Sequence, residues 1–312
     1  MIQVLDTLLP VFAIIGLAFW LGRRGWLTHA FVSELNWLIF WVSLPALIIH
    51  SLATAPSLPR DTGPIVILFF IATLIVIALS FPVCRFLRLP REQIGTFVQA
   101  AFRGNLAYTG LPIVIFALHD QTREVVALAV AQVMFVLAPA MILYNVIAVF
   151  LLVGSQEGFS LKKVREIVGK VVTNPLILAS VIGVGIFALP AKPPHFVFNT
   201  LDLIGQMAAP AALFCVGGAM AFVSMEGRYR SASVASVLKI LILPAIAAGL
   251  LLFVDVEPVA RLVLLVLSAC PTAVASYIMA KELGGDEALA AGSIIISTVA
   301  CIPVLGLIIA FA

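Results

Sequence analysis

Apolar residues occur along this chain in ten long runs, separated by short polar stretches. A helix that crosses a bilayer needs about 20 mostly apolar residues. The pattern therefore predicts an all-α polytopic membrane protein with ten transmembrane helices. The expected spans are 4–21, 31–52, 64–86, 94–118, 125–153, 174–189, 196–222, 231–254, 258–281 and 288–311.

Two of these runs contain residues that a membrane helix should avoid. The fourth run carries an arginine, an asparagine, two glycines and a proline within 101–112, and the ninth carries a proline and polar residues within 268–273. Glycine costs about 1 kcal/mol in a helix interior and proline about 3 kcal/mol. Backbone freed by such a break is tolerated only inside protein or beside a water-filled cavity. Two broken spans are typical of a transporter with its substrate site near mid-membrane.

Prolines recur at a fixed interval, which indicates an internal repeat. Three pairs lie 164 or 165 residues apart: Pro10 and Pro175, Pro45 and Pro210, and Pro139 and Pro303. We expect the members of the last two pairs to interrupt their helices. The spacing predicts a first five-helix repeat over 1–153, a cytoplasmic linker over 154–173 and a second repeat over 174–312. Because five is odd, the second repeat would be inverted, and the fourth and ninth spans would be equivalent.

The distribution of basic residues predicts the orientation. With the N-terminus outside, twelve lysines and arginines fall in inner loops and four in outer loops. The four are Arg60, Arg123, Lys192 and Arg261. Both termini are therefore expected on the outer, periplasmic side of the cell inner membrane. Tryptophans 20, 26 and 37 cluster around Arg23 and Arg24, as interfacial anchors do.

Composition agrees with a membrane protein and excludes several other classes. The chain is 63% hydrophobic and 11% charged, against about 25% charged for a globular domain. The net charge of +3 is explained by the loop bias, so no nucleic-acid partner is expected. The four cysteines lie in apolar runs without metal-ligand spacing, so neither a metal site nor a cofactor is expected. Enzyme motifs for serine hydrolysis, zinc proteolysis and nucleotide binding are missing from the sequence.

The first break carries the strongest candidates for substrate binding. Gly104 permits the break, and Asn105 follows it with an amide that offers two donors and an acceptor. Beside the free N–H groups of a half-helix, this amide would suit a carboxylate, or it would only satisfy unwound backbone. Arg103 is an ionisable residue at membrane depth, which by itself suggests a functional site. Its guanidinium would bind a carboxylate or a structural partner.

Weaker candidates lie elsewhere. Pro271 and Thr272 mark the second break, where the hydroxyl would bond the ligand or a freed carbonyl. Ser43, one turn before Pro45, is a further candidate. Lys239 lies about two turns from the inner end of its span and is expected to snorkel to the interface. His50 and Asp202, near outer helix ends, are expected to be solvated residues, with proton coupling as the alternative.

Several motifs together resemble the auxin efflux carrier family, whose bacterial members are compact permeases. Asn105 stands seven residues before Pro112 in a motif that ends Gly110-Leu111-Pro112. Cys270-Pro271-Thr272 leads into Tyr277-Ile278-Met279-Ala280-Lys281-Glu282, and Asp286-Glu287-Ala288-Leu289 opens the tenth run. Leu44-Pro45-Ala46-Leu47 completes the pattern in the second run. The resemblance covers essentially the whole chain.

This resemblance implies a fold in two parts. Spans 1, 2, 6 and 7 would form a scaffold that makes a homodimer through spans 2 and 7. Spans 3–5 and 8–10 would form a moving transport unit, in which spans 4 and 9 cross at Asn105 and Pro271. It also implies that Asn105 holds the substrate's carboxylate. Bacterial members are associated with small carboxylates such as malonate, malate or lactate.

These expectations converge on a secondary transporter of small organic anions that works by elevator-type alternating access. Auxin-like anions remain possible substrates. One alternative is a sodium-coupled carrier of the bile-acid-transporter type, which shares the crossed-helix plan. Two others are a non-transporting membrane receptor and a polytopic membrane enzyme. The enzyme would need paired acids, or a nucleophile with a base, at membrane depth.

Overall fold

The computed structural model describes residues 2–54, 61–154, 173, 175–188, 193–223 and 227–311. The described part is helical, and its only extended pairing is a single isolated bridge between Gly104 and Thr272. The all-α prediction is therefore confirmed. The expected linker over 154–173 lies outside the described residues except at its first and last positions.

The described residues form a series of helices with three short π-helical turns. In order these are α1 (Ile2–Arg23), α2 (His29–Leu38), η1 (Ile39–Ser43), α3 (Leu44–Ala53), α4 (Thr62–Phe86), α5 (Arg91–Phe102), η2 (Leu106–Gly110), α6 (Leu111–Ala117), α7 (Arg123–Gly154), α9 (Pro175–Ala188), α10 (His195–Gln206), α11 (Ala208–Phe222), α12 (Tyr229–Val237), η3 (Leu238–Ile242), α13 (Leu243–Leu250), α14 (Pro258–Ala269), α15 (Ala275–Glu282) and α16 (Glu287–Phe311).

Helices occupy all ten apolar runs of the sequence. Within the described ranges, six stretches are long and apolar enough to cross a membrane: His29–Ala53, Thr62–Phe86, Arg123–Leu152, His195–Phe222, Tyr229–Leu250 and Glu287–Phe311. Four shorter apolar helices accompany them: Leu8–Arg23, Leu106–Ala117, Pro175–Ala188 and Pro258–Ala269. The chain is thus a multi-pass membrane protein, and the number of crossings depends on how the shorter helices are counted.

Prolines shape the helices in two different ways. Each π-helical turn is followed directly by a Leu-Pro pair, at Pro45, Pro112 and Pro244. A proline ring clashes with the carbonyl four residues earlier, and widening the preceding turn relieves that clash. The expected interruption by Pro139 and Pro303 is wrong, because α7 and α16 continue through them. A proline inside a long helix removes one hydrogen bond and commonly bends the helix without ending it.

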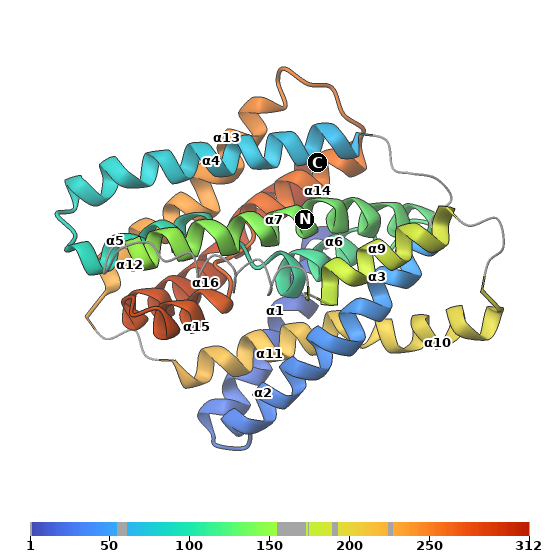
Figure 1. Cartoon of the computed structure of the whole chain (residues 1–312). Helices are drawn as coiled ribbons and strands as arrows, with labels where there is room; N and C mark the ends of the chain where they lie inside the picture. The colour runs from blue at the N-terminus through green and yellow to red at the C-terminus, as the bar shows by residue number, and fades with distance from the viewer. Residues whose placement is uncertain are drawn as a thin grey trace.

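The helices pack in two groups (Figure 1). In one group, α1 packs against α11, and α3 packs against α9 and α10. In the other, α12 packs against α16, α5 against α4 and α7, and α13 against α14. The groups touch where α3 meets α7 and where α11 meets η2. Both broken segments therefore belong to the second group, and the first of them meets the first group through η2.

The first group depends on a close approach between α1 and α11. A Cβ built on Gly217 would overlap the backbone carbonyl oxygen of Ile15, whereas a Cβ on Gly16 would meet nothing within 4 Å. We expect Gly217→Ala to destabilise the protein by about 1–3 kcal/mol, because backbone must move. Gly16→Ala is expected to be neutral or slightly stabilising, since alanine favours helix by about 1 kcal/mol. Thermal unfolding of both purified variants in detergent measures the difference, and equal midpoints would contradict the close packing.

Candidate functional site at the crossing of two interrupted helices

The two interrupted segments meet at their breaks. Helix α5 ends at Phe102, and the chain passes through Arg103-Gly104-Asn105 before η2 begins. Helix α14 ends at Ala269, and the chain passes through 270–274 before α15 begins. Gly104 and Thr272 form an antiparallel bridge, in which the Asn105 N–H donates to the Pro271 carbonyl at 2.8 Å. The Ala273 N–H donates to the Arg103 carbonyl at 3.0 Å.

This bridge explains how a broken helix is stable at this depth. A helix end leaves four N–H or four C=O groups without partners, and lipid supplies none. Here, part of the backbone freed by each break pairs with the backbone freed by the other. Both breaks predicted from glycine, proline and asparagine are present. Each supplies hydrogen-bond partners for backbone groups of the other.

The bridge separates the nearby side chains into two sets. Successive residues of an extended segment point to opposite faces, so Arg103 and Asn105 share a face while Gly104 points the other way. Gly104 lies in the non-hydrogen-bonded position opposite Thr272, where side chains are closest. A Cβ on Gly104 would lie 3.1 Å from Lys239 Cε, which places Lys239 on the Gly104 face.

The side chains on the Gly104 face are closely packed, and most of their polar groups have hydrogen-bond partners. Thr272 donates its hydroxyl to the Ala100 carbonyl at 2.9 Å, and its N–H donates to Ser297 Oγ at 2.9 Å. The hydroxyl thus takes the second of its two expected roles and bonds a carbonyl freed at the end of α5. Ser268 Oγ is buried without a partner among the described residues, although the carbonyl of Ser268 is bonded.

Lys239 does not snorkel, and that expectation is wrong. Its side chain is 0% exposed, and Nζ donates to the Ser268 carbonyl at 2.6 Å, in the last turn of α14. A cation near a helix C-terminus is favoured by the helix dipole, and the freed carbonyl supplies a direct acceptor. Distance along the helix suggested that the side chain could reach the interface. The break in α14 provides a closer partner.

Asn105 is buried, with 7% of its surface exposed. Its carbonyl accepts from the N–H groups of Thr109 and Gly110, both at 3.0 Å, and so starts the π-helical turn. Its side-chain amide makes no hydrogen bond within the described part of the chain. A polar group on a residue with so little exposed surface normally has a partner. It therefore offers both donors and an acceptor beside the N-terminal end of a half-helix.

Arg103 is also 7% exposed and is held by neutral groups. Nη2 donates to Asn145 Oδ1 at 3.0 Å, Nη1 donates to Met279 Sδ at 3.1 Å, and the guanidinium lies 6.0 Å from the Tyr144 ring centroid. Among the described residues, no carboxylate lies within 4.0 Å of Arg103. The first break thus carries a buried cation whose charge no acid neutralises.

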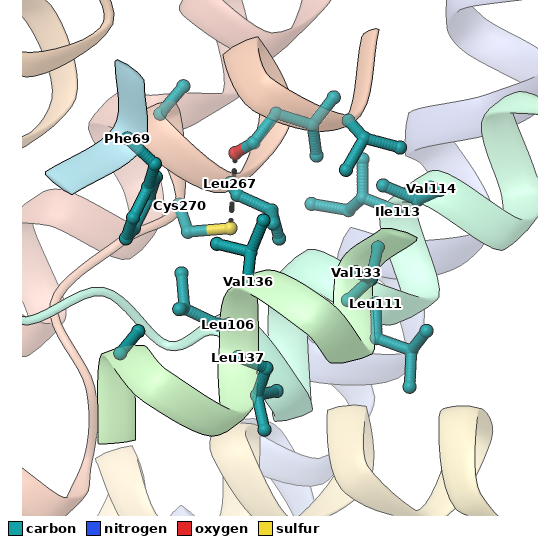
Figure 2. Packing of buried hydrophobic residues seen from close by; sticks show 14 of the residues in the cluster. Phe69, Leu106, Leu111, Ile113, Val114, Val133, Val136, Leu137, Leu267 and Cys270 are labelled. Carbon is teal, nitrogen blue, oxygen red and sulfur yellow. Dashed lines mark hydrogen bonds between the residues drawn. The ribbon is translucent and has the colours of Figure 1, made fainter. Parts of the chain in front are cut away.

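Below the bridge, apolar side chains join the broken segments to their neighbours. Figure 2 shows Leu106 and Leu111 of the fourth run in one cluster with Leu267 and Cys270 of the ninth. Cys270 donates its thiol to the Val266 carbonyl at 3.2 Å, as the dashed line marks. A Cβ on Gly110 would lie 2.7 Å from Cys270 Sγ, so only glycine allows this approach.

Comparison with known proteins also indicates a membrane transporter. Residues 3–309 match the model of a family described as "Membrane transport protein". The chain belongs to this family. A protein of Rhizobium meliloti (strain 1021) named "Putative malonate transporter" is 24% identical over 309 residues, which cover 96% of this chain and 92% of that protein. The resemblance to the auxin efflux carrier family is confirmed, and this member of it is a membrane transporter.

Not every expected residue of this transporter lies at the crossing. Pro271 does, through its carbonyl. Ser43 lies in η1, where its hydroxyl is buried without a partner among the described residues, and nothing in the structure joins it to the bridge. His50 and Asp202 lie 3.9 Å apart, partly exposed, on α3 and α10. They form a pair that neither position alone indicated.

Three residues beside Arg103 were missed by the sequence interpretation. Gln99 lies one turn before Arg103 on α5, Asn145 lies within α7, and Met279 lies on α15. The signal for the first two was present, because an amide side chain within an apolar run needs a partner. Met279 gave no signal, since a methionine in such a run resembles any other apolar residue.

Proposed function

We propose that this protein is a secondary transporter of small organic anions, namely mono- or dicarboxylates such as malonate, malate or lactate. The observation that carries the proposal is the Asn105 side-chain amide, which has no hydrogen-bond partner among the described residues although the residue is only 7% exposed, and which lies beside the start of a half-helix. N–H donors and the positive end of a helix dipole favour a carboxylate. The name of the R. meliloti relative supports this substrate class.

Arg103 and the backbone of the crossing would complete the site. Gly104 keeps the backbone close, and Pro271 and Thr272 hold the second break against the first. Arg103 contributes positive charge on the same face as Asn105. In this arrangement Thr272 acts through the backbone of the crossing, and Ser43 stays a candidate for a later step of transport.

Transport would follow from movement of one helix group against the other. The group that contains α4, α5, α7 and α12–α16 would be the transport unit, and the group that contains α1, α3 and α9–α11 would be the scaffold. Close glycine packing between α1 and α11 supports a rigid scaffold. We place ten spans as two inverted repeats in the inner membrane, with both termini outside. A homodimer would form through the second and seventh spans.

Counterflow in proteoliposomes tests this function. Vesicles loaded with unlabelled malonate should accumulate labelled malonate, and external malate or lactate should compete. The neutral diamide of malonate should not compete, because it lacks the charge that the site is built to bind. A receptor would bind malonate without exchange, so binding without counterflow would contradict the proposal of transport.

A sodium-coupled carrier is the second candidate. The Lys239 amine lies against Gly104, where it would repel a nearby cation. We therefore expect counterflow to be the same in sodium and in choline buffers. Exchange that requires sodium would favour the bile-acid-transporter type of mechanism.

A further inference from the structure

In the cluster around Arg103, two strong hydrogen-bond donors share one weak acceptor. Gln99 lies in the last turn of α5, and Arg103 follows directly after the end of that helix. Both donate to the same atom, the Sδ of Met279: Arg103 Nη1 at 3.1 Å and Gln99 Nε2 at 3.6 Å. A thioether is a weak acceptor, whereas a guanidinium is a strong, charged donor with no acceptor capacity. A charged donor at the crossing therefore meets one of the weakest acceptors.

We propose that Met279 is a displaceable internal ligand of Arg103 and Gln99, and that an anionic group of the substrate binds these two side chains in place of its sulfur. This inference rests on the proposed function, because the anion is the transported carboxylate. It adds Gln99 to the binding site and makes Met279 a residue that controls access to it. Asn145, which accepts from Nη2, is the positioning residue that orients the guanidinium.

Burial and charge favour the exchange of sulfur for oxygen. Gln99 is 0% exposed and Arg103 is 7% exposed, so both donors are largely shielded from water. A buried cation is costly unless it is paired, and a carboxylate supplies the missing charge. Carboxylate also accepts two parallel hydrogen bonds from guanidinium, which sulfur cannot do. Gln99 Oε1 has no partner among the described residues, so this amide is not fully engaged in the present arrangement.

Met279 has the properties that a displaceable ligand needs. Its side chain has three rotatable bonds and adapts readily to different surroundings. It is partly exposed, and it lies on α15, the short half-helix that follows the second break. Loss of its sulfur contact with α5 would release α15 from Arg103 and Gln99. Anion binding at the first break would thus change the contacts of α15, the helix that follows the second break.

The test compares two substitutions of Met279 in the purified protein, with malonate as the probe. Met279→Leu keeps the volume but removes the acceptor, so malonate should bind about tenfold more tightly, which corresponds to about 1.4 kcal/mol. Met279→Glu supplies an internal carboxylate, so malonate binding should fall at least tenfold. Met207→Leu, at an exposed methionine between α10 and α11, is the control and should leave the affinity unchanged. Titration calorimetry gives each Kd.

A second measurement needs no substrate. Met279→Glu should unfold at a higher temperature than Met279→Leu, because the introduced carboxylate would pair with Arg103, and Arg103→Gln in the Met279→Glu background should remove that gain. If Met279→Glu unfolds no later than Met279→Leu, the inference is overturned whatever the protein transports. If wild type binds no carboxylate although Met279→Glu is stabilised, the proposed function fails and the Arg103 contact stands. Unchanged Kd values in both Met279 variants would also overturn the inference.

Discussion

Replacing Asn105 with alanine should reduce malonate counterflow to the level of empty vesicles while the protein stays folded. A hydrogen bond to a charged group contributes about 1.5–3 kcal/mol, so losing one weakens substrate binding by roughly 10- to 150-fold. The fold should survive, because Asn105 holds the crossing through its backbone N–H and starts η2 through its carbonyl, and alanine keeps both groups. Size-exclusion chromatography and thermal unfolding in detergent check the fold, and counterflow checks function.

Two further variants sharpen this result. Asn105→Asp keeps the size of the side chain but places a negative charge where the anion would bind, so it should be at least as inactive as the alanine variant. Asn199→Ala removes an exposed asparagine on α10 and should leave exchange intact. If Asn105→Ala still exchanges malonate at the wild-type rate, the amide is not part of the site, and the main support for carboxylate recognition is lost.

The positions of the two breaks could be predicted from the sequence because they depend on local chemistry. Gly104, Asn105 and Pro271 are poor residues for a continuous helix, and lipid makes their effect stronger. The crossing of the two breaks was implied by the family resemblance, whereas the antiparallel pairing of their backbones was not predicted. What could be predicted was therefore the existence of a crossing and the residues that form it.

The partners of the side chains could not be predicted, because they come from distant parts of the chain. Lys239 illustrates the point: its depth in a span was evident, but its contact with the Ser268 carbonyl depends on how α14 packs against η3. Met279 is a second case, since its neighbours Gln99 and Arg103 precede it by 180 and 176 residues. Proline predicted helix interruptions only in part, because it follows a widened turn at Pro45 but lies within a continuous helix at Pro139.

The two faces of the bridge differ in their chemistry, and we assign stability of the crossing to the Gly104 face and substrate recognition to the opposite face. On the Gly104 face, Lys239 and Thr272 satisfy carbonyls freed by the breaks. On the opposite face, the Asn105 amide has no hydrogen-bond partner among the described residues, and Arg103 meets only neutral groups. A crossing built this way can stay intact while its second face exchanges ligands. Substitutions on the two faces should accordingly have different effects.

Replacing Lys239 with glutamate should prevent stable folding, whereas replacing it with methionine should be tolerated. Glutamate would bury an acceptor-only group against the Ser268 carbonyl, and an uncompensated buried charge costs about 3–5 kcal/mol. Methionine loses a charged hydrogen bond of about 1.5–3 kcal/mol. It also removes the cost of burying a cation, which is several kcal/mol, so the two changes largely offset each other.

Fluorescence-detected size-exclusion chromatography and thermal unfolding separate these outcomes. Lys239→Met should give a single sharp peak and an unfolding midpoint within a few degrees of wild type, and Lys239→Glu should give aggregate or a much lower midpoint. Lys281→Glu, at an exposed lysine in the last turn of α15, is the matched control and should stay folded. A wild-type midpoint for Lys239→Glu would mean that the amine does not hold the end of α14, and the Gly104 face would then need another source of stability.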